Sequence, residues 1–153
     1  MRCLSVCQPW AWALIHGPKR VENRTWKTSY RGPLLIHSGK SHKWDMPTLP
    51  DGTDVPTDLA YGVLVGVVDL VDCVPYIVSL GPFAIPGHWC WIVENPRPCE
   101  QVAWKGQLSL FEVPESAIQL ALPPAVPLSS ANGGSDTSSG IVPGQVALGH
   151  LYP

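Results

Sequence analysis

Charged residues are scarce in this sequence. Asp, Glu, Lys and Arg account for 14% of its 153 residues, whereas a typical globular domain has roughly 25%. An unbroken apolar segment of membrane-spanning length is also missing. The longest stretch before residue 123 without these four residue types is 73–93, and three prolines and two glycines interrupt it. Because such breakers are not expected in a lipid-exposed helix, the sequence indicates no membrane span.

The usual signatures of secretion, metal binding and cofactor binding are absent as well. No basic, apolar leader opens the sequence, and the five cysteines are an odd number with no C-x-x-C pair. We therefore expect a cytoplasmic protein with reduced thiols. On one strand, Cys3 and Cys7 would lie about 13 Å apart, too far to bind the same ion directly. Neither a Walker loop nor a Rossmann fingerprint occurs, so we expect no metal and no cofactor.

Proline and glycine are abundant, with seventeen and fourteen residues, and they exclude a helical bundle or a coiled coil. Pro9 suits the first turn of a helix and Gly17 suits its end, which predicts a helix over 9–17. A second short helix is expected over 115–122, a loop over 38–60, and a strand end at 95–98. Alternating and β-branched segments predict strands over 2–7, 21–26, 34–37, 61–71, 88–94 and 107–113. With no βαβ rhythm, this pattern predicts a mixed α+β fold, mainly β, built as a small β-barrel.

The last 31 residues differ in composition from the rest. Residues 123–153 contain no Lys or Arg, one acid (Asp136), and fifteen Pro, Gly or Ser residues. Such a segment buries little apolar surface, so we expect one domain over 1–122 followed by a flexible tail over 123–153. The alternative is a tail that lies across the barrel through its apolar residues, Ile141, Val142, Val146 and Leu148.

Charge is divided unequally along the chain. Residues 1–44 contain eight Lys and Arg against a single acid, Glu22, whereas 45–153 contain two basic residues against eleven acids. This division predicts a basic face that attracts phosphate or another anion, beside an acidic remainder. The alternative is that the two signs mix on the folded surface. An acidic half also leaves open a protein partner, bound through that half or through the tail.

Three charged residues, Lys19, Glu22 and Arg24, lie within six positions. On a strand, Glu22 and Arg24 share a face with Trp26, because side chains alternate. One interpretation is a cleft in which Lys19 and Arg24 hold a phosphate or an anionic transition state, with Glu22 as their orienting group or as a general base. The other is a surface ion pair between Glu22 and Arg24, which contributes little.

Seven tryptophans are the second unusual feature. Indole faces stack on bases, and single-stranded nucleic acids bind grooves that combine such rings with basic groups. Trp10 and Trp26 flank the charged cluster and are candidates for base stacking, with core packing as the alternative. For Trp89 and Trp91, on one face of a strand, core packing is expected. His37, at the end of an apolar strand, is expected to be a buried, hydrogen-bonded histidine.

The charged cluster is part of a longer pattern. Gly17, Lys19, Glu22 and Arg24 form a complete G-x-K-x-x-E-x-R signature. This signature resembles the hallmark of the ASCH domain family, in particular its short bacterial and phage members. Five further blocks resemble the family in the same order, over 8–11, 23–26, 30–37, 89–96 and 105–111. The resemblance covers about residues 2–113.

The resemblance implies a PUA-like β-barrel with one or two short helices and an association with RNA. Some members are amidohydrolases that remove the acyl group of N4-acetylcytidine, and one is described as a ribonuclease. The amidohydrolases place a Lys and a Thr in the signature segment. Lys19 matches that Lys, whereas Glu22 stands in place of the Thr, so this chain lacks the hydroxyl nucleophile at that position.

We therefore expect an ASCH-type module that binds RNA or a modified nucleoside or nucleotide in a basic, Trp-edged cleft. The alternative is a small hydrolase, an amidohydrolase or a ribonuclease, that uses Lys19, Glu22 and Arg24 as catalytic residues. The expected binding residues are Gln8, Trp10, Lys19, Arg24, Trp26, Tyr30, Arg31 and Glu94. Gln8 belongs to a family block, Arg31 precedes a turn that would place it at the cleft, and Glu94 ends a strand as a second acid.

Overall fold

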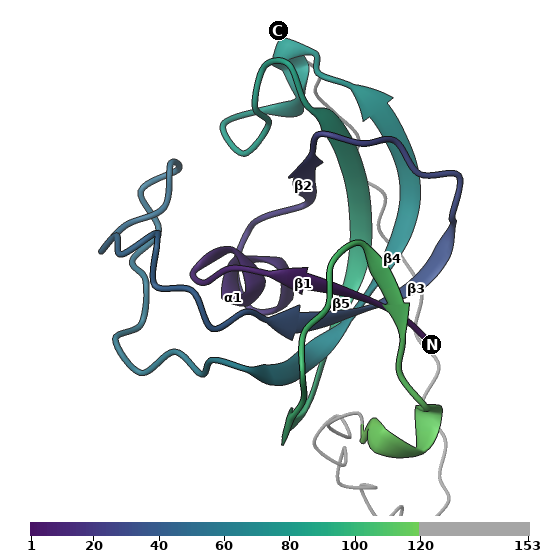
Figure 1. Ribbon diagram of the computed structural model, residues 1–153. Helices are drawn as coiled ribbons and strands as arrows, with labels where there is room; N and C mark the ends of the chain where they lie inside the picture. The colour runs from purple at the N-terminus through teal and green to yellow at the C-terminus, as the bar shows by residue number, and fades with distance from the viewer. Residues whose placement is uncertain (120–153) are drawn as a thin grey trace, which may run out of the picture. The chain divides into compact units, whose positions relative to one another are not determined.

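One six-stranded sheet forms most of the structure, a computed structural model that describes residues 1–119. The strands are β1 (Arg2–Val6), β2 (Val21–Arg24), β3 (Gly32–Ser38), β4 (Val63–Pro75), β5 (Trp89–Ala103) and β6 (Leu110–Glu112). The helices are α1 (Trp10–Ile15) and the 3-10 turns η1 (Val78–Leu80) and η2 (Glu115–Ala117). The long strands β4 and β5 curve strongly, so the sheet curls into a half-barrel (Figure 1). This confirms the predicted mixed α+β, mainly β, fold, whereas the predicted tail over 123–153 lies outside the described residues.

The strand order in the sheet is β2-β5-β4-β3-β1-β6. All neighbouring pairs are antiparallel except β1 and β3, which run parallel with Cys3 opposite Leu35. The chain therefore leaves β1, forms α1 and β2, and returns to lie beside β1. The sequence showed no βαβ rhythm because only this one crossover is present, and β2 follows the helix before the return strand. The crossover places α1 against the sheet.

Helix α1 forms from an apolar segment whose first turn is held by Gln8. The Gln8 side chain accepts a hydrogen bond from the backbone N–H of Trp12 at 3.0 Å, in a turn where N–H groups lack helical partners. On the sheet side, Gly66 of β4 permits close packing of the helix. A Cβ at Gly66 would lie 2.6 Å from the carbonyl oxygen of Arg97 and 2.8 Å from a methyl group of Ile15. A larger residue at this position would force α1 and β5 away from β4.

The apolar core has two parts, one on each face of the sheet. Neighbouring residues of β3 alternate between them: Leu34 and Ile36 pack with α1, β1 and Trp91, while Leu35 packs with Phe111 and its neighbours on the opposite face. All five are buried. This explains the apolar run in β3, because neither face of a strand that is covered on both sides is exposed to water. Burial of each such side chain contributes about 1.5–3 kcal/mol.

The predicted end of the fifth strand at 95–98 is wrong. β5 continues through Pro96 and Pro98 to Ala103, and Asn95 adopts a positive φ of 48°. Two features allow this. The register with β4 shifts around these residues, and β2 pairs with β5 only as far as Ile92, so among residues 1–119 no strand pairs with residues 95–98 on that side. Proline lacks the N–H that a central strand needs, but it is tolerated at bulges and edges.

Other predicted bounds differ by a few residues. The last strand, predicted over 107–113, is limited to Leu110–Glu112, and Ser109 before it has a positive φ of 57°. The helix predicted over 115–122 is a 3-10 turn, Glu115–Ala117, within the described residues. The loop predicted over 38–60 is present, with one isolated bridge between Thr48 and Asp54. No helix in the described part of the chain is long and apolar enough to cross a membrane.

The cysteines of the described residues are all free thiols. Cys3, Cys73, Cys90 and Cys99 are buried, and Cys7 is half-buried. Burial raises the pKa of the Cys3 thiol to about 12, so this thiol stays protonated at neutral pH. Within residues 1–119, no group of three or more His, Cys, Asp or Glu side chains is placed to hold a metal ion. The buried cysteines are therefore part of the packing of the sheet.

Candidate functional site

The turn after α1 and strand β2 place the charged cluster. The backbone N–H of Lys19 donates to the carbonyl of Ala13 at 3.1 Å, which holds the turn against the helix. β2 then pairs with β5, with Glu22 opposite Trp91 and Arg24 opposite Trp89. The alternation of strand side chains puts Glu22 and Arg24 on the same face, as the sequence predicted. The turn brings Lys19 to that face.

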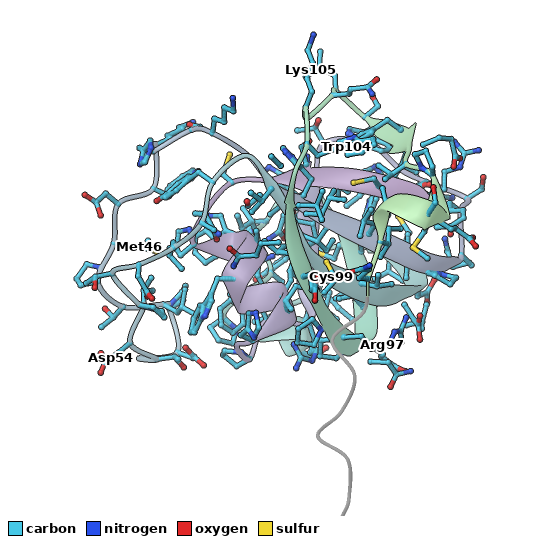
Figure 2. All side chains as sticks on the ribbon, turned by 90° about the horizontal axis from the view of Figure 1, so that it is seen from below. Met46, Asp54, Arg97, Cys99, Trp104 and Lys105 are labelled. Carbon is cyan, nitrogen blue, oxygen red and sulfur yellow. The ribbon has the colours of Figure 1, made fainter. Side chains whose placement is uncertain are left out.

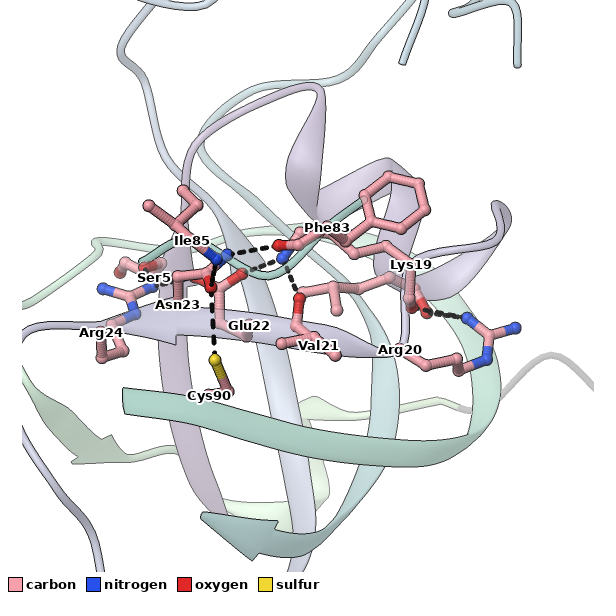
Figure 3. Close-up of polar contacts among 11 residues, drawn as sticks. Ser5, Lys19, Arg20, Val21, Glu22, Asn23, Arg24, Phe83, Ile85 and Cys90 are labelled. Atoms are coloured by element: carbon pink, nitrogen blue, oxygen red, sulfur yellow. Dashed lines mark hydrogen bonds and ion pairs between the residues drawn. The ribbon is translucent and has the colours of Figure 1, made fainter. Parts of the chain in front are cut away.

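Glu22 lies between the two cations (Figure 3). Its Oε2 is 2.7 Å from Lys19 Nζ, and its Oε1 is 3.0 Å from Arg24 Nη2. Lys19 and Glu22 are buried, with 3% and 6% of their surfaces exposed, and Arg24 is half-buried. The structure therefore contains neither the exposed Glu22–Arg24 pair nor three independent surface charges. It contains a buried triad that carries one net positive charge.

The two cations determine the protonation state of Glu22. Burial by itself raises the pKa of this carboxyl, but the charges and hydrogen bonds of Lys19 and Arg24 outweigh that effect. The resulting pKa lies below its ordinary value of 4.5. At neutral pH the group is a carboxylate whose two oxygens each contact a cation. Such a group is a poor proton acceptor, because protonation would break both contacts.

Within residues 1–119, the two cations do not use all of their N–H donors in hydrogen bonds. Lys19 Nζ donates to the Val21 carbonyl and to Glu22, which uses two of its three N–H groups. Arg24 Nη2 also donates to the carbonyl of Ser5 at 2.8 Å. Its Nε is buried and has no hydrogen-bond partner among residues 1–119. Buried polar atoms are nearly always paired, so this guanidinium N–H is an exception.

The triad lines a cleft of about 490 Å³. Trp10 of α1 and Trp44 of the 38–60 loop form part of its wall, with ring centroids 6.3 Å apart at an interplanar angle of 66°. Lys19 Nζ lies 5.8 Å from the centroid of Trp10. Trp44 is 44% exposed, so one indole of the cleft is open to solvent. This volume falls within the range of roughly 300–1,000 Å³ that is usual for small-molecule sites.

The opposite wall is fixed by Asn23. Its amide donates to the carbonyl of Phe83 at 2.7 Å, and its oxygen accepts from the backbone N–H of Ile85 at 2.9 Å. Both bonds join β2 to the segment 82–88, whose residues Pro82, Phe83, Ile85 and His88 line the cleft. Figure 3 shows Asn23 pointing toward this segment from β2. Asn23 is thus a positioning residue for the wall.

Sequence reasoning missed Trp44, Asn23 and the 82–88 wall. Asn23 lies inside the signature, between Glu22 and Arg24, so its position could have indicated that it belongs to the site. Trp44 lies in a polar loop and 82–88 in a turn-rich connection, and neither segment has a periodicity that predicts where it packs. Their place in the cleft depends on contacts between residues far apart in the sequence, such as the one between Trp10 and Trp44.

The structure brings four of the predicted site residues together: Trp10, Lys19, Glu22 and Arg24 line the same cleft. Gln8 is buried, caps α1 and donates to the carbonyl of Ala60 at 2.8 Å. These contacts tie the helix to the end of the 38–60 loop. Gln8 lines a different hollow, together with Trp12.

The remaining predicted residues are also outside the lining of the cleft. Trp26 packs edge-to-face on Trp91, with centroids 4.7 Å apart. Tyr30 donates from its hydroxyl to the carbonyl of Pro33, and Arg31 pairs with Asp72 at 3.0 Å. Glu94 lies within β5 and is exposed.

Three predictions of ordinary structural roles are confirmed. Trp91 is fully buried in the core, and Trp89 packs against that core from its edge. His37 is 2% exposed, and its ring nitrogens contact the Ser5 hydroxyl at 3.1 Å and the Trp104 carbonyl at 3.0 Å. It is therefore the buried, hydrogen-bonded histidine that was expected.

Comparison with known proteins decides the family. The ASCH domain model matches residues 4–85, which is more than half of the chain and includes every lining residue of the cleft except His88. The chain belongs to the ASCH domain family. The predicted family is thereby confirmed, and it points to an RNA-binding module of the PUA-like kind. The blocks that resemble the family after residue 85 lie outside the matched range and stay predictions.

Two curated relatives contain a similar segment. Activating signal cointegrator 1 of Homo sapiens is 44% identical over 81 residues, and the protein of the same name from Mus musculus is 46% identical over 81 residues. In both cases the match covers 46% of this chain but only 14% of the relative. The ASCH chain described here thus matches about a seventh of the length of these relatives.

Proposed function

We propose that this ASCH domain binds RNA, or a modified nucleoside or nucleotide, in the cleft formed by Trp10, Trp44 and the Lys19–Glu22–Arg24 triad. The observation that carries the proposal is one cleft that is lined by two indole rings and by the side chains of Lys19 and Arg24. A nucleotide offers the matching groups, since it has an aromatic base and oxygen acceptors on the base, sugar and phosphate.

The indoles supply the stacking surface. Trp10 is partly buried against the core, which fixes its ring, while Trp44 is 44% exposed on the loop. A base that inserts beside Trp44 covers an apolar ring that is now exposed to water. Stacking of a base on an aromatic side chain contributes about 1–3 kcal/mol and depends little on the sequence of the nucleic acid.

The triad supplies the polar contacts. Lys19 and Arg24 both line the cleft, and the triad carries a net positive charge. An oxygen of the ligand would therefore meet donors that are already oriented by Glu22. Because that orientation exists before binding, little side-chain entropy is lost when the ligand enters.

Binding is favoured over hydrolysis by the state of Glu22. A general base for attack on an acetamide needs a carboxylate oxygen that is free to accept a proton. Both oxygens of Glu22 contact cations, and its pKa is lowered. No contact in the cleft therefore specifically supports the alternative function, removal of the acyl group of N4-acetylcytidine. A turnover assay distinguishes binding from hydrolysis.

The decisive experiment is a titration of the purified chain with single-stranded RNA, cytidine monophosphate and N4-acetylcytidine, followed by tryptophan fluorescence and calorimetry. We expect Trp44→Ala to weaken binding about tenfold, the equivalent of one stacked base. The matched control is Trp12→Ala, a half-buried indole of α1 that lines a different hollow. It is expected to leave binding unchanged once both variants are shown to be folded.

Three results would overturn the proposal. The first is the absence of binding to any of the three ligands, and the second is equal affinity of Trp44→Ala and the parent chain. The third is release of cytidine from N4-acetylcytidine, measured by chromatography and abolished in Lys19→Ala, which would establish the hydrolase instead. A partner protein for the acidic part of the chain stays a prediction.

A further inference from the structure

A second groove adjoins the cleft at Ser5. It has a volume of about 960 Å³, and Ser5 lines both hollows. The Ser5 carbonyl accepts the 2.8 Å hydrogen bond from Arg24 in the cleft, while its hydroxyl contacts His37, which lines the second groove. Ser5 thus contributes its backbone carbonyl to the polar contacts of the cleft and its side chain to those of the groove.

The second groove is lined by cations without acids. Lys40 and Lys105 are its charged lining residues, and no Asp or Glu belongs to the lining. Both lysines are exposed, and within residues 1–119 neither forms an ion pair. Lys105 extends from the chain into solvent beside Trp104 (Figure 2). Two free ammonium groups on one groove favour a ligand with negative charge.

Three glycines contribute to the walls of the groove. Gly39, Gly62 and Gly106 line it. A Cβ at Gly106 would lie 2.7 Å from the His37 ring and 2.8 Å from the Ser5 hydroxyl, so only glycine fits against this pair. A Cβ at Gly62 would lie 2.8 Å from the Cε of Lys40, which shows that the Lys40 stem lies across Gly62.

The groove also offers an aromatic side chain. Trp104 is half-buried and lines the groove. It packs against the part of the core that contains Leu35 and Phe111. The backbone carbonyl of Trp104 contacts the His37 ring at 3.0 Å, and the backbone N–H of Trp104 donates to the Gly62 carbonyl at 3.0 Å. The ring is therefore held on a fixed backbone. The groove repeats the combination seen in the cleft, an indole beside two cationic groups.

We propose that the cleft and the second groove form one track for single-stranded RNA, with one nucleotide in the cleft and the flanking phosphates against Lys40 and Lys105. This inference rests on the proposed function and narrows its ligand from a nucleoside to a polymer. A free nucleoside needs only the cleft. A strand that leaves the cleft past Ser5 meets the lysines and the Trp104 ring, the pairing of charge and stacking that single-strand binding uses.

The test compares a ligand that fills only the cleft with one that spans the track. The probes are cytidine monophosphate and a single-stranded oligoribonucleotide of about six nucleotides, within the roughly 4–16 nucleotides that one small β-barrel domain can cover. The parent chain is titrated with each at several salt concentrations. We expect tighter binding of the oligonucleotide and a steeper fall of its affinity with salt, because more phosphate contacts release more counterions.

The variants are Lys40→Ala and Lys105→Ala, with Lys27→Ala as the control. Lys27 is also exposed and its ammonium lies over Trp89, outside both hollows. Each groove variant is expected to weaken the oligonucleotide about fivefold and to reduce its salt slope by about 0.7, the value for one contact on a single strand. Binding of cytidine monophosphate is expected to stay unchanged, as is all binding by Lys27→Ala.

The outcomes separate the two proposals. If the parent chain binds the mononucleotide and the oligonucleotide equally well, or if the groove variants match Lys27→Ala, the track is wrong and the cleft proposal stands. If a groove variant weakens both ligands equally, the lysines act on the cleft and the track is again wrong. If the parent chain binds neither of these ligands, the track fails, and if it does not bind N4-acetylcytidine either, the proposed function fails as well.

Discussion

Lys19 Nζ lies 2.7 Å from Glu22 Oε2 in the interior of the protein, and Arg24 contacts the other oxygen of the same carboxylate at 3.0 Å. These contacts give the ASCH signature a physical meaning, because its Lys, Glu and Arg form one buried ionic unit. The carboxylate neutralises one of the two cations and orients both. The stability of the fold and the polarity of the cleft therefore depend on the same three side chains.

Replacement of Glu22 by Gln is expected to lower the free energy of unfolding by about 3 kcal/mol. The change leaves the buried Lys19 and the half-buried Arg24 without their counter-charge, and loss of one partner of a buried pair typically costs about 3–5 kcal/mol. Urea unfolding followed by tryptophan fluorescence measures the effect. The matched control is Glu112→Gln, which removes an exposed pair with Arg2 and is expected to cost less than about 1 kcal/mol. Equal effects of the two variants would contradict the prediction.

Acid is expected to destabilise the protein through the same carboxylate. The folded pKa of Glu22 lies below its ordinary value of 4.5, so the unfolded chain binds a proton at higher pH than the folded chain does. The contribution of Glu22 is therefore fully present above about pH 5 and is lost as the pH falls below 4.5. Urea midpoints between pH 7 and pH 3 measure this slope.

Two other groups, His37 and Asp69, also make the free energy of unfolding fall as the pH is lowered, so the contribution of Glu22 has to be distinguished from theirs. Burial lowers the pKa of His37 below its ordinary value of 6.5. The unfolded chain therefore binds this proton more readily, and the free energy of unfolding begins to fall below pH 6.5. Bonds from Arg97 and Asn95 lower the pKa of Asp69. Glu22→Gln is expected to retain both contributions while losing the part that Glu22 contributes below pH 4.5. An unchanged slope below that pH in the variant would show that Glu22 is not the group responsible.

Asn23→Ala is expected to loosen the 82–88 wall and to weaken ligand binding. It removes the hydrogen bonds to Phe83 and Ile85, at a cost of about 1–3 kcal/mol in unfolding free energy. Hydrogen exchange of the backbone amides in 82–88 reports the loosening directly. Asn23→Asp keeps an oxygen for the Ile85 N–H but loses the donor to Phe83, so it should fall between Asn23→Ala and the parent chain. Protection of 82–88 that does not change in Asn23→Ala would contradict the positioning role.

Gly66→Ala is expected to destabilise the fold by about 1–3 kcal/mol through overpacking. The added methyl group would lie 2.6 Å from the Arg97 carbonyl and 2.8 Å from Ile15, both closer than contact allows. Gly39→Ala is the control, since its nearest neighbour would be at 3.7 Å. Thermal unfolding of both variants measures the difference. A Gly66→Ala protein as stable as Gly39→Ala would mean that α1 does not pack this closely on β4.

A chain shortened to residues 1–122 is expected to fold as the full chain does. Among residues 1–119, both parts of the core are already formed, and the backbone N–H of Glu100 donates to the Gln119 carbonyl within the same range. Equal unfolding midpoints and equal RNA affinity of the two chains would support a domain boundary near residue 122. A large loss of stability on shortening would place part of the fold beyond it.

Local pattern predicted the elements of this domain better than their extents. Pro9 and Gly17 bracket α1, and the apolar run over 34–37 indicated the strand that the structure shows as β3. The long strand β5 was predicted too short because Pro96 and Pro98 read as breakers. Their tolerance depends on a shifted register and a free edge, which arise only when β2 and β4 pair with β5. No local feature of 95–98 carries that information.

In the candidate site, too, some features follow from local sequence pattern and others depend on tertiary packing. Strand alternation predicted that Glu22 and Arg24 share a face, whereas the direction of Lys19 was left open because it lies in a turn. Trp26 shares their alternation, yet its ring packs on Trp91 in the core. Alternation fixes the face of a strand, but the packing of the neighbouring strand decides whether that face is cleft or core.

The sequence by itself determined the family, the mainly β fold and the composition of the charged cluster, because each of these depends on residues that are close together in the chain. The tertiary structure decided that the cluster is buried, that Asn23 holds the facing wall, and that Trp44 rather than Trp26 joins Trp10. It also decided that Ser5 lies between the cleft and a second, lysine-lined groove. These properties come from contacts between distant segments, whose free energies depend on the whole curled sheet rather than on local pattern.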